Sequence, residues 1–158
     1  QKPILKNNIE EDLKNFIRPA VRGCLNNLKD DLESKGYEVS MKEPEIEIEL
    51  VPDNVLVNID ADLKVTKDGT ESFDNIIIGY KSKIYNFIMI ASSIINWETR
   101  FGDSESLNYM LYYPSIKVEK KKQGEGSKIY IITDRETNEK FYFAVRGYVI
   151  PAGVFDIK

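Results

Sequence analysis

Two alternating runs of residues constrain the fold of this chain more than any other feature of its sequence. In residues 45–50, isoleucine and leucine alternate with glutamate, and in residues 55–65 every second residue is apolar. Strict alternation is typical of strands that bury one face. A Pro-Asp pair between the two runs favours a turn. The pattern therefore predicts an antiparallel ribbon in which Leu50 lies opposite Val55.

The residues that follow this ribbon extend the sheet. Asp68 and Gly69 form a strong hairpin signal, so residues 73–80 are expected to be a third strand. Three consecutive isoleucines in residues 76–78 are typical of a strand that is covered on both faces. Three further strands are expected later in the chain, at residues 115–119, 129–133 and 141–150.

Two other segments have the spacing of helices. Apolar residues in 9–32 recur three and four positions apart, which predicts a helix. Pro19 lies inside this segment and predicts a kink or a break just before it. A second helix is expected at residues 83–98, capped by Ser82 and followed by a loop over residues 99–111. This second helix is apolar on most sides, which is typical of a buried helix or of one that binds a partner.

The order of these elements is helix, three strands, helix, three strands. It predicts an α+β fold of two helix-plus-three-strand halves, with an antiparallel meander sheet packed against two helices. No change in composition and no linker divides the chain. We therefore expect a single domain over residues 1–158, with flexible ends at residues 1–8 and 152–158.

Charge and hydropathy restrict the classes of partner. The net charge of -4 does not favour binding to nucleic acid or to an anionic membrane. The most apolar stretch, residues 84–97, is shorter than the roughly 20 residues that cross a bilayer. Because the chain begins with Gln1, we expect it to be part of a longer product that carried a signal or a membrane anchor. Contact with a membrane is expected only through such a segment, which this chain lacks.

The chain contains no histidine and one cysteine, Cys24. No Ser/His/Asp or Cys/His set, zinc-ligand spacing or dinucleotide-binding glycine pattern is present. Cys24 falls within the apolar stripe of the first helix, so it is expected to be a small buried thiol; the alternative is one half of a disulfide to an upstream segment. We therefore predict no catalytic residues and no cofactor.

Carboxylates gather on the non-core face of the predicted ribbon. In the expected register Glu45 faces Asp60 and Glu47 faces Asn58, with Asp62 on the same side. Like charges across a ribbon repel, and a bound Ca²⁺ would relieve that repulsion. Glu45, Glu47, Asp60 and Asp62 are therefore candidate calcium ligands, although a flat ribbon does not enclose an ion. A solvated acidic face is the default expectation.

A group of lysines surrounds a glycine-rich hairpin tip late in the chain. One interpretation is a phosphate-binding finger, but its glycines match no phosphate-loop pattern. We expect a solvated hairpin whose charges protect a sheet edge. The lysines of this group are Lys117, Lys120, Lys121, Lys122 and Lys128.

Aromatic residues are frequent from the second helix onward. Trp97, Tyr109, Tyr112 and Tyr113 are candidates for a binding interface, because exposed Tyr and Trp are typical of such surfaces. Phe141 and Phe143 of the final strand are expected to fill the core instead. In the same part of the chain, Glu98 and Arg146 are candidates for a buried ion pair.

Five segments in this order resemble a family of exported archaeal surface proteins whose own activity is uncharacterised. The segments are 24–28 (CLNNL), 36–39 (GYEV), the acidic ribbon, 82–91 and 141–146 (FYFAVR). Members of that family have an N-terminal membrane anchor and an outward-facing domain, so the resemblance implies an extracellular location. They often carry an upstream cysteine that would partner Cys24, and this chain has no second cysteine.

Together these features lead to one expected function and two alternatives. The chain is expected to be a non-enzymatic extracellular binding or assembly module of an archaeal cell-surface protein, with a protein partner or self-association. The first alternative is a small-molecule-binding or hydrolytic domain with a pocket between helix 84–98 and the sheet. The second is a calcium-stabilised adhesion domain.

Overall fold

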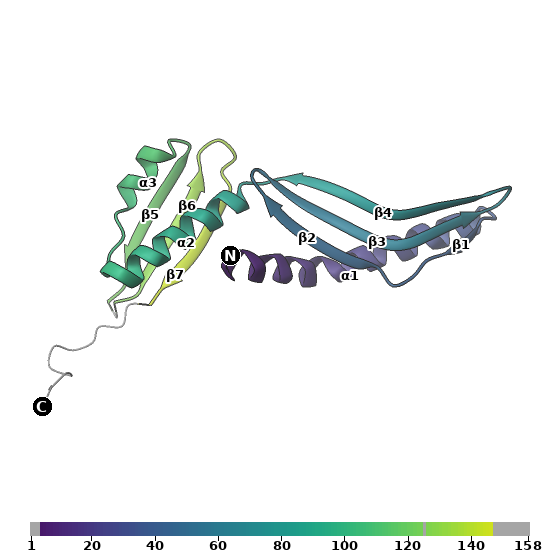
Figure 1. Cartoon of the computed structure of the whole chain (residues 1–158), viewed down its shortest axis with the longest axis horizontal. Coiled ribbons are helices and arrows are strands. Elements are labelled where there is room, and N and C mark those ends of the chain that lie inside the picture. Colours follow the sequence, from purple (N-terminus) through teal and green to yellow (C-terminus); the bar gives the residue numbers. More distant parts are fainter. Residues whose placement is uncertain (1–3, 125, 147–158) are drawn as a thin grey trace, which may run out of the picture. The chain divides into compact units, whose positions relative to one another are not determined.

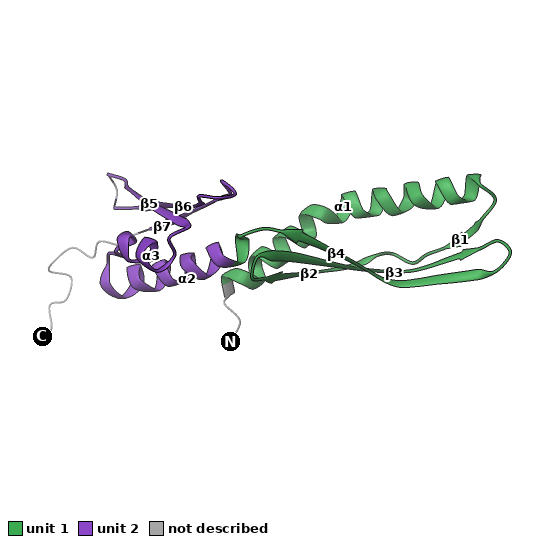
Figure 2. Ribbon diagram, turned by 90° about the horizontal axis from the view of Figure 1, so that it is seen from above, with its two compact units in different colours: residues 1–85 green, residues 86–158 purple. Residues whose placement is uncertain are grey.

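The computed structural model describes residues 4–124 and 126–146 of the chain. These residues form an α+β fold with three helices and two antiparallel sheets, which confirms the predicted fold class. The chain forms two compact units, residues 1–85 and residues 86–158 (Figures 1 and 2). The expected single domain stays a prediction, since compactness does not test whether the two units unfold together. Among the described residues, no helix is both long and apolar enough to span a membrane.

The first unit consists of one long helix and a four-stranded sheet (Figure 1). Strand β3 is central: β1 and β2 pair with successive parts of one side of it, and β4 pairs with the other side. Its elements are α1 (Ile4–Ser34), β1 (Glu38–Ser40), β2 (Glu45–Val51), β3 (Asn54–Thr66) and β4 (Thr70–Lys81).

The register of β2 and β3 confirms the prediction from alternation. Leu50 lies opposite Val55, and Glu45 lies opposite Asp60. The tight turn between the strands places Asp53 in the left-handed region at a φ of 62°. Further along β3 the pairing with β4 shifts between Asp60 and Leu63, where a bulge interrupts the ladder. Ile59 and Ala61, two residues of the face predicted to be buried, are both buried next to this bulge.

Helix α1 packs against β1 and β2 and covers the apolar face of the sheet. Leu25 on the helix meets Ile59 and Ala61 on β3 in the core of the unit. The prediction for Pro19 was a kink or a break. The break is wrong, because α1 is one helix from Ile4 to Ser34, and the kink stays a prediction. Burial of apolar side chains on the sheet offsets the hydrogen bond that proline removes.

Two further expectations for α1 are also wrong. Residues 4–8, which were expected to be flexible, form the first turns of this helix. Cys24 is exposed, because its neighbour Leu25 takes the position that faces the core. The other expected flexible end, residues 152–158, lies outside the described part of the chain.

Strand β4 differs most from expectation. The three isoleucines predicted a strand covered on both faces, but Ile77 is 70% exposed and Ile78 is 51% exposed. Every residue of β4 except Ile76 is exposed. The physical reason is position: β4 is the last strand on its side of β3, and α1 packs against β1 and β2 instead.

The second unit contains two helices and a three-stranded sheet in the order β5-β6-β7. Helix α2 is buried along Phe87, Ile88, Ile90, Ala91 and Ile94, as its composition predicted. The Ser82 side chain accepts a hydrogen bond from the Ile84 amide, which confirms the predicted cap. The elements are α2 (Ile84–Phe101), α3 (Ser106–Tyr112), β5 (Ile116–Lys122), β6 (Lys128–Asp134) and β7 (Lys140–Val145).

Helix α3 lies inside the segment that was expected to be a loop, residues 99–111. It has seven residues, which is too short for a periodic pattern to identify. The last predicted strand ends early, at Val145, and its residues 147–150 lie outside the described residues. Phe141 and Phe143 of β7 stack on Phe87 and Tyr130, so the expectation that they fill the core is confirmed.

Candidate functional site: an aromatic pocket in the second unit

The four residues predicted to form an interface all line one pocket. Trp97 comes from the C-terminal half of α2, Tyr109 and Tyr112 come from α3, and Tyr113 follows α3 directly. The pocket has a volume of about 580 Å³. Ligand sites in proteins commonly measure about 300–1,000 Å³, so this pocket is large enough to hold two or three side chains of a partner.

The aromatic lining is open to solvent. Tyr112 is 82% exposed, Trp97 is 49% exposed and Tyr113 is 52% exposed. Trp97 also contacts Phe101, with ring centroids 4.6 Å apart, so the apolar surface continues beyond the pocket. Large exposed aromatic groups of this kind are costly in water and typical of binding surfaces.

Polar groups complete the lining and fix its shape. The hydroxyl groups of Ser93 on α2 and Tyr109 on α3 are 2.9 Å apart and share a hydrogen bond. The Glu105 side chain caps α3 by accepting from the Leu107 amide. The remaining lining residues are Asp103, Ser104 and Asn108, which offer carboxylate, hydroxyl and amide groups.

A buried carboxylate holds the segment between the two helices. Glu98 of α2 is almost fully buried and accepts a hydrogen bond from the Ser104 amide at 2.9 Å. It forms an ion pair with Lys128 of β6 at 2.7 Å and accepts from the hydroxyl of Tyr130 on the same strand. Glu98 therefore ties the rim of the pocket to the middle strand of the sheet.

A second carboxylate extends this network. Asp103 pairs with Lys120 of β5 and with Lys128, both at 2.9 Å. Lys120 also donates to the backbone carbonyl of Ser104 at 2.8 Å. We call Glu98, Asp103, Lys120, Lys128 and Tyr130 the rim clamp, because together they fix the segment that joins α2 to α3.

The contacts within the rim clamp shift the pKa values of its members. Burial alone would raise the pKa of Glu98, but hydrogen bonds from Lys128, Tyr130 and Ser104 outweigh it and lower that pKa. The hydrogen bond from Lys120, with that from Lys128, holds the pKa of Asp103 well below its ordinary value. Burial, reinforced by Glu98, raises the pKa of Tyr130 well above its ordinary value. Glu98 and Asp103 are therefore charged, and Tyr130 is protonated, at neutral pH.

The predicted partner of Glu98 is wrong. Arg146 is exposed, and the buried ion pair forms with Lys128. The interpretation of the hairpin lysines is wrong for two of them as well. The Lys120 and Lys128 side chains are 15% and 13% exposed and paired with carboxylates, so they are structural rather than solvated.

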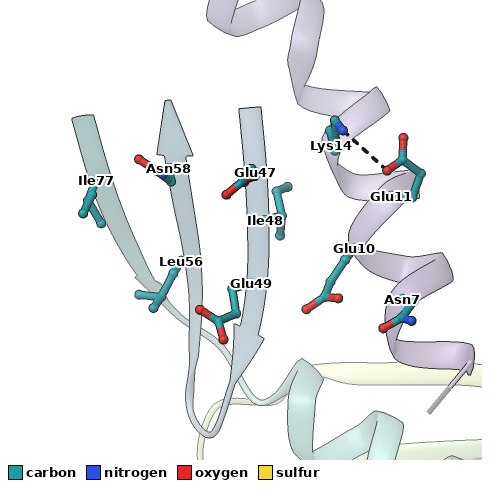
Figure 3. Close-up of a pocket in the computed structure, with 10 residues that line it drawn as sticks. All are labelled: Asn7, Glu10, Glu11, Lys14, Glu47, Ile48, Glu49, Leu56, Asn58 and Ile77. Carbon is teal, nitrogen blue, oxygen red and sulfur yellow. Dashed lines mark ion pairs between the residues drawn. The ribbon is translucent and has the colours of Figure 1, made fainter. Parts of the chain in front are cut away.

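The acidic ribbon forms part of a second pocket, in the first unit. This pocket has a volume of about 620 Å³ and is lined by residues of α1, β2, β3 and β4 (Figure 3). Glu47 and Glu49 line it from β2, and Glu10 and Glu11 line it from α1. Both helix carboxylates already have partners: Glu10 accepts from the Leu50 amide, and Glu11 pairs with Lys14.

The candidate calcium ligands do not form a cluster. Asp60 pairs with Lys42 at 3.3 Å and accepts from the Asp62 amide, and Asp62 lies 3.8 Å from Lys64. Within residues 4–124 and 126–146, no three His, Cys, Asp or Glu side chains are grouped so that they could hold a metal ion. Lys42 and Lys64 thus pair with the two aspartates of this face.

Sequence patterns could identify the aromatic residues of the site but not its support. Tyrosine and tryptophan stand out by type, whereas Lys128 and Tyr130 acquire their roles only because β6 passes beneath the end of α2. No signal in the sequence indicates which lysine will form an ion pair with a buried glutamate.

Comparisons with known proteins identify no relative of this chain. No family model matches the chain, and no curated protein or solved structure matches it. Inferences about function therefore depend on the chain's own residues.

Proposed function

We propose that this chain is a non-enzymatic binding module that docks a protein partner in the aromatic pocket formed by Trp97, Tyr109, Tyr112 and Tyr113. The observation that carries the proposal is the convergence of these four residues on one open pocket. Tyr and Trp are the residues that most often dominate the binding energy of protein interfaces.

The shape of the pocket supports a protein partner. The exposed aromatic surface continues from Trp97 to Phe101 on α2, and α3 exposes Leu107 and Leu111 beside its tyrosines. A small ligand would leave most of that surface in water. A polypeptide segment would cover it and would also meet the polar groups of Glu105 and Asn108 at the rim.

The rim clamp supports a preformed site. It fixes the segment between α2 and α3 through ion pairs and hydrogen bonds to the sheet, so the partner does not need to order that segment. Binding to a preorganised surface avoids part of the entropy cost of association.

The rival hydrolytic function draws no support from Glu98. A general acid at neutral pH needs a raised pKa, as in glycosidases. The pKa of Glu98 is lowered instead, and its oxygens are occupied by Lys128, Tyr130 and Ser104. Glu98 therefore acts as a structural anchor in this proposal.

Alanine substitution in the pocket tests the proposal. Partners captured from a cell-envelope extract by the full chain are identified, purified and titrated against Tyr112→Ala and Trp97→Ala. Each substitution should weaken binding about 10-fold or more, as expected for an interface hot spot. Tyr142→Ala is the matched control, because Tyr142 is a similarly exposed tyrosine of β7 outside the pocket. Equal loss with the control variant, or full binding by both pocket variants, would contradict the proposal.

The cell-surface location is a separate proposal that rests on the family resemblance. Protease treatment of intact cells tests it with an antibody against this chain. Loss of the antibody signal while a cytoplasmic marker survives would support an outward-facing domain, and protection of both would contradict it.

A further inference from the structure

The outer edge of strand β4 has no partner among the described residues. β4 pairs only with β3, and it is the outermost strand on that side of the first sheet (Figure 1). It is 12 residues long. In an antiparallel ladder alternate residues point their N–H and C=O groups away from the neighbouring strand, so β4 presents a long row of unpaired backbone groups.

Apolar side chains accompany this open edge. Ile77 and Ile78 are exposed in the middle of β4, and Phe73 and Tyr80 are exposed toward its two ends. Ile78 and Tyr80 lie opposite Val57 and Val55, whose own burial is only partial. Natural proteins rarely leave a long apolar edge strand uncovered, because such edges pair with other chains.

The charges of β4 are distributed unevenly along the strand. The acidic residues Glu71 and Asp74 lie in its N-terminal half, and Lys81 is its last residue. When two copies of β4 pair antiparallel, each Lys81 approaches the acidic half of the other strand. A parallel pair would set like charges side by side, which destabilises neighbouring strands.

We propose that two copies of this chain associate through antiparallel pairing of their β4 edges, which joins the two first-unit sheets into one continuous sheet. Such a contact is self-complementary about a two-fold axis, the commonest symmetry of soluble homodimers. The isoleucines lie at its centre and the charge pairs at its two ends. This surface belongs to the first unit and does not depend on the aromatic pocket.

Lysine substitution at the centre of the edge tests the proposal. The full chain is expected to show a concentration-dependent dimer in sedimentation equilibrium, and Ile77→Lys/Ile78→Lys is expected to be monomeric at the same concentrations. Phe16→Lys is the matched control, because Phe16 is an apolar residue on α1 of the same unit and is even more exposed than the two isoleucines. The control should dimerise like the parent chain, and circular dichroism should show all three proteins folded.

A charge exchange tests the antiparallel orientation. Lys81→Glu makes both ends of the strand acidic, and Glu71→Lys/Asp74→Lys makes both ends basic. Each variant alone should dimerise at least about 10-fold more weakly than the parent, since two cross-strand pairs become repulsive. An equimolar mixture of the two variants should recover association as a heterodimer.

Three results would overturn the proposal. A parent chain that stays monomeric over the whole concentration range would contradict pairing of the β4 edges. Equal loss of the dimer in Phe16→Lys would place the contact on α1. A mixture of the charge variants that stays monomeric would exclude antiparallel pairing. Because none of these readouts involves Trp97 or Tyr112, they are independent of binding at the aromatic pocket.

Discussion

At the scale of single residues, Glu98 shows how a buried charge is used in this chain. It lies near the end of α2, and three donors from two segments surround it: Lys128 and Tyr130 of β6, and the Ser104 amide. Removing one member of a buried ion pair leaves an uncompensated charge, which is more costly than losing the attraction alone. The same carboxylate therefore contributes to stability and fixes the rim of the pocket.

Glu98→Gln should make stability less dependent on acid pH. The pKa of Glu98 is lowered by folding, so its stabilising contribution is complete above the ordinary value of 4.5 and is lost as the pH falls through the folded value. We expect Glu98→Gln to lose about 3 kcal/mol of unfolding free energy at neutral pH. The difference from the parent should shrink steadily below pH 4.5. Urea unfolding at a series of pH values measures both quantities.

Glu136→Gln provides the control for this experiment. Glu136 is an exposed carboxylate of the same unit, in the turn after β6. Its substitution should change the unfolding free energy by less than about 0.5 kcal/mol at every pH. A gap between Glu98→Gln and the parent that stays constant down to acid pH would contradict the role assigned to the rim clamp.

At the scale of elements, the strands were the most predictable part of the fold. Alternation in β2 and β3 fixed both their register and their buried face, because a shift by one residue would have exposed every apolar side chain. The same reasoning failed for β4. Three adjacent isoleucines indicate a preference for strand structure, but whether they are covered depends on where α1 lies, and no local pattern encodes that position.

Helices were less predictable at their interruptions and ends. α3 was missed because seven residues contain fewer than two periods of a helix. Pro19 was expected to kink or break α1, yet one helix continues from Ile4 to Ser34 and contacts β1 and β2. Local signals compete with tertiary packing at such positions, and here packing prevailed.

Pro19→Ala should stabilise the first unit. Pro19 is exposed, so its ring contributes little packing, and alanine restores a backbone N–H to the interior of α1. A proline costs about 3 kcal/mol relative to alanine in a helix interior, and we expect at least about 1 kcal/mol of that to be recovered. Thermal unfolding followed by circular dichroism at 222 nm measures the change. Asn15→Ala, one turn earlier on the exposed side, should change the midpoint much less, and a destabilised Pro19→Ala would contradict the expectation.

At the scale of the whole molecule, the chain provides a natural probe in each compact unit. Trp97 is the only tryptophan and lies in the second unit, and Cys24 is the only cysteine and is exposed in the first. Tryptophan fluorescence and a fluorophore attached to Cys24 therefore report on the two units separately.

The two probes should give coincident unfolding transitions. We expect a single domain, and domains of roughly 150 residues commonly unfold in one cooperative step. Urea titrations of the labelled chain measure the two midpoints, one from the fluorescence of Trp97 and one from the emission of the fluorophore on Cys24. The labelled chain is first compared with the unlabelled chain to show that the fluorophore does not change the tryptophan transition. Two separate midpoints would show that residues 1–85 and 86–158 unfold independently.

The rim clamp has a practical consequence for reagents directed at this molecule. Every residue that lines the aromatic pocket lies between positions 93 and 113, so a synthetic peptide of that stretch would carry the complete set of contact groups. It would nevertheless lack the two lysines and the tyrosine of β5 and β6 that hold those groups in place. Antibodies raised against such a peptide would recognise a linear epitope, whereas immunisation with the intact chain is needed to obtain antibodies that block the pocket.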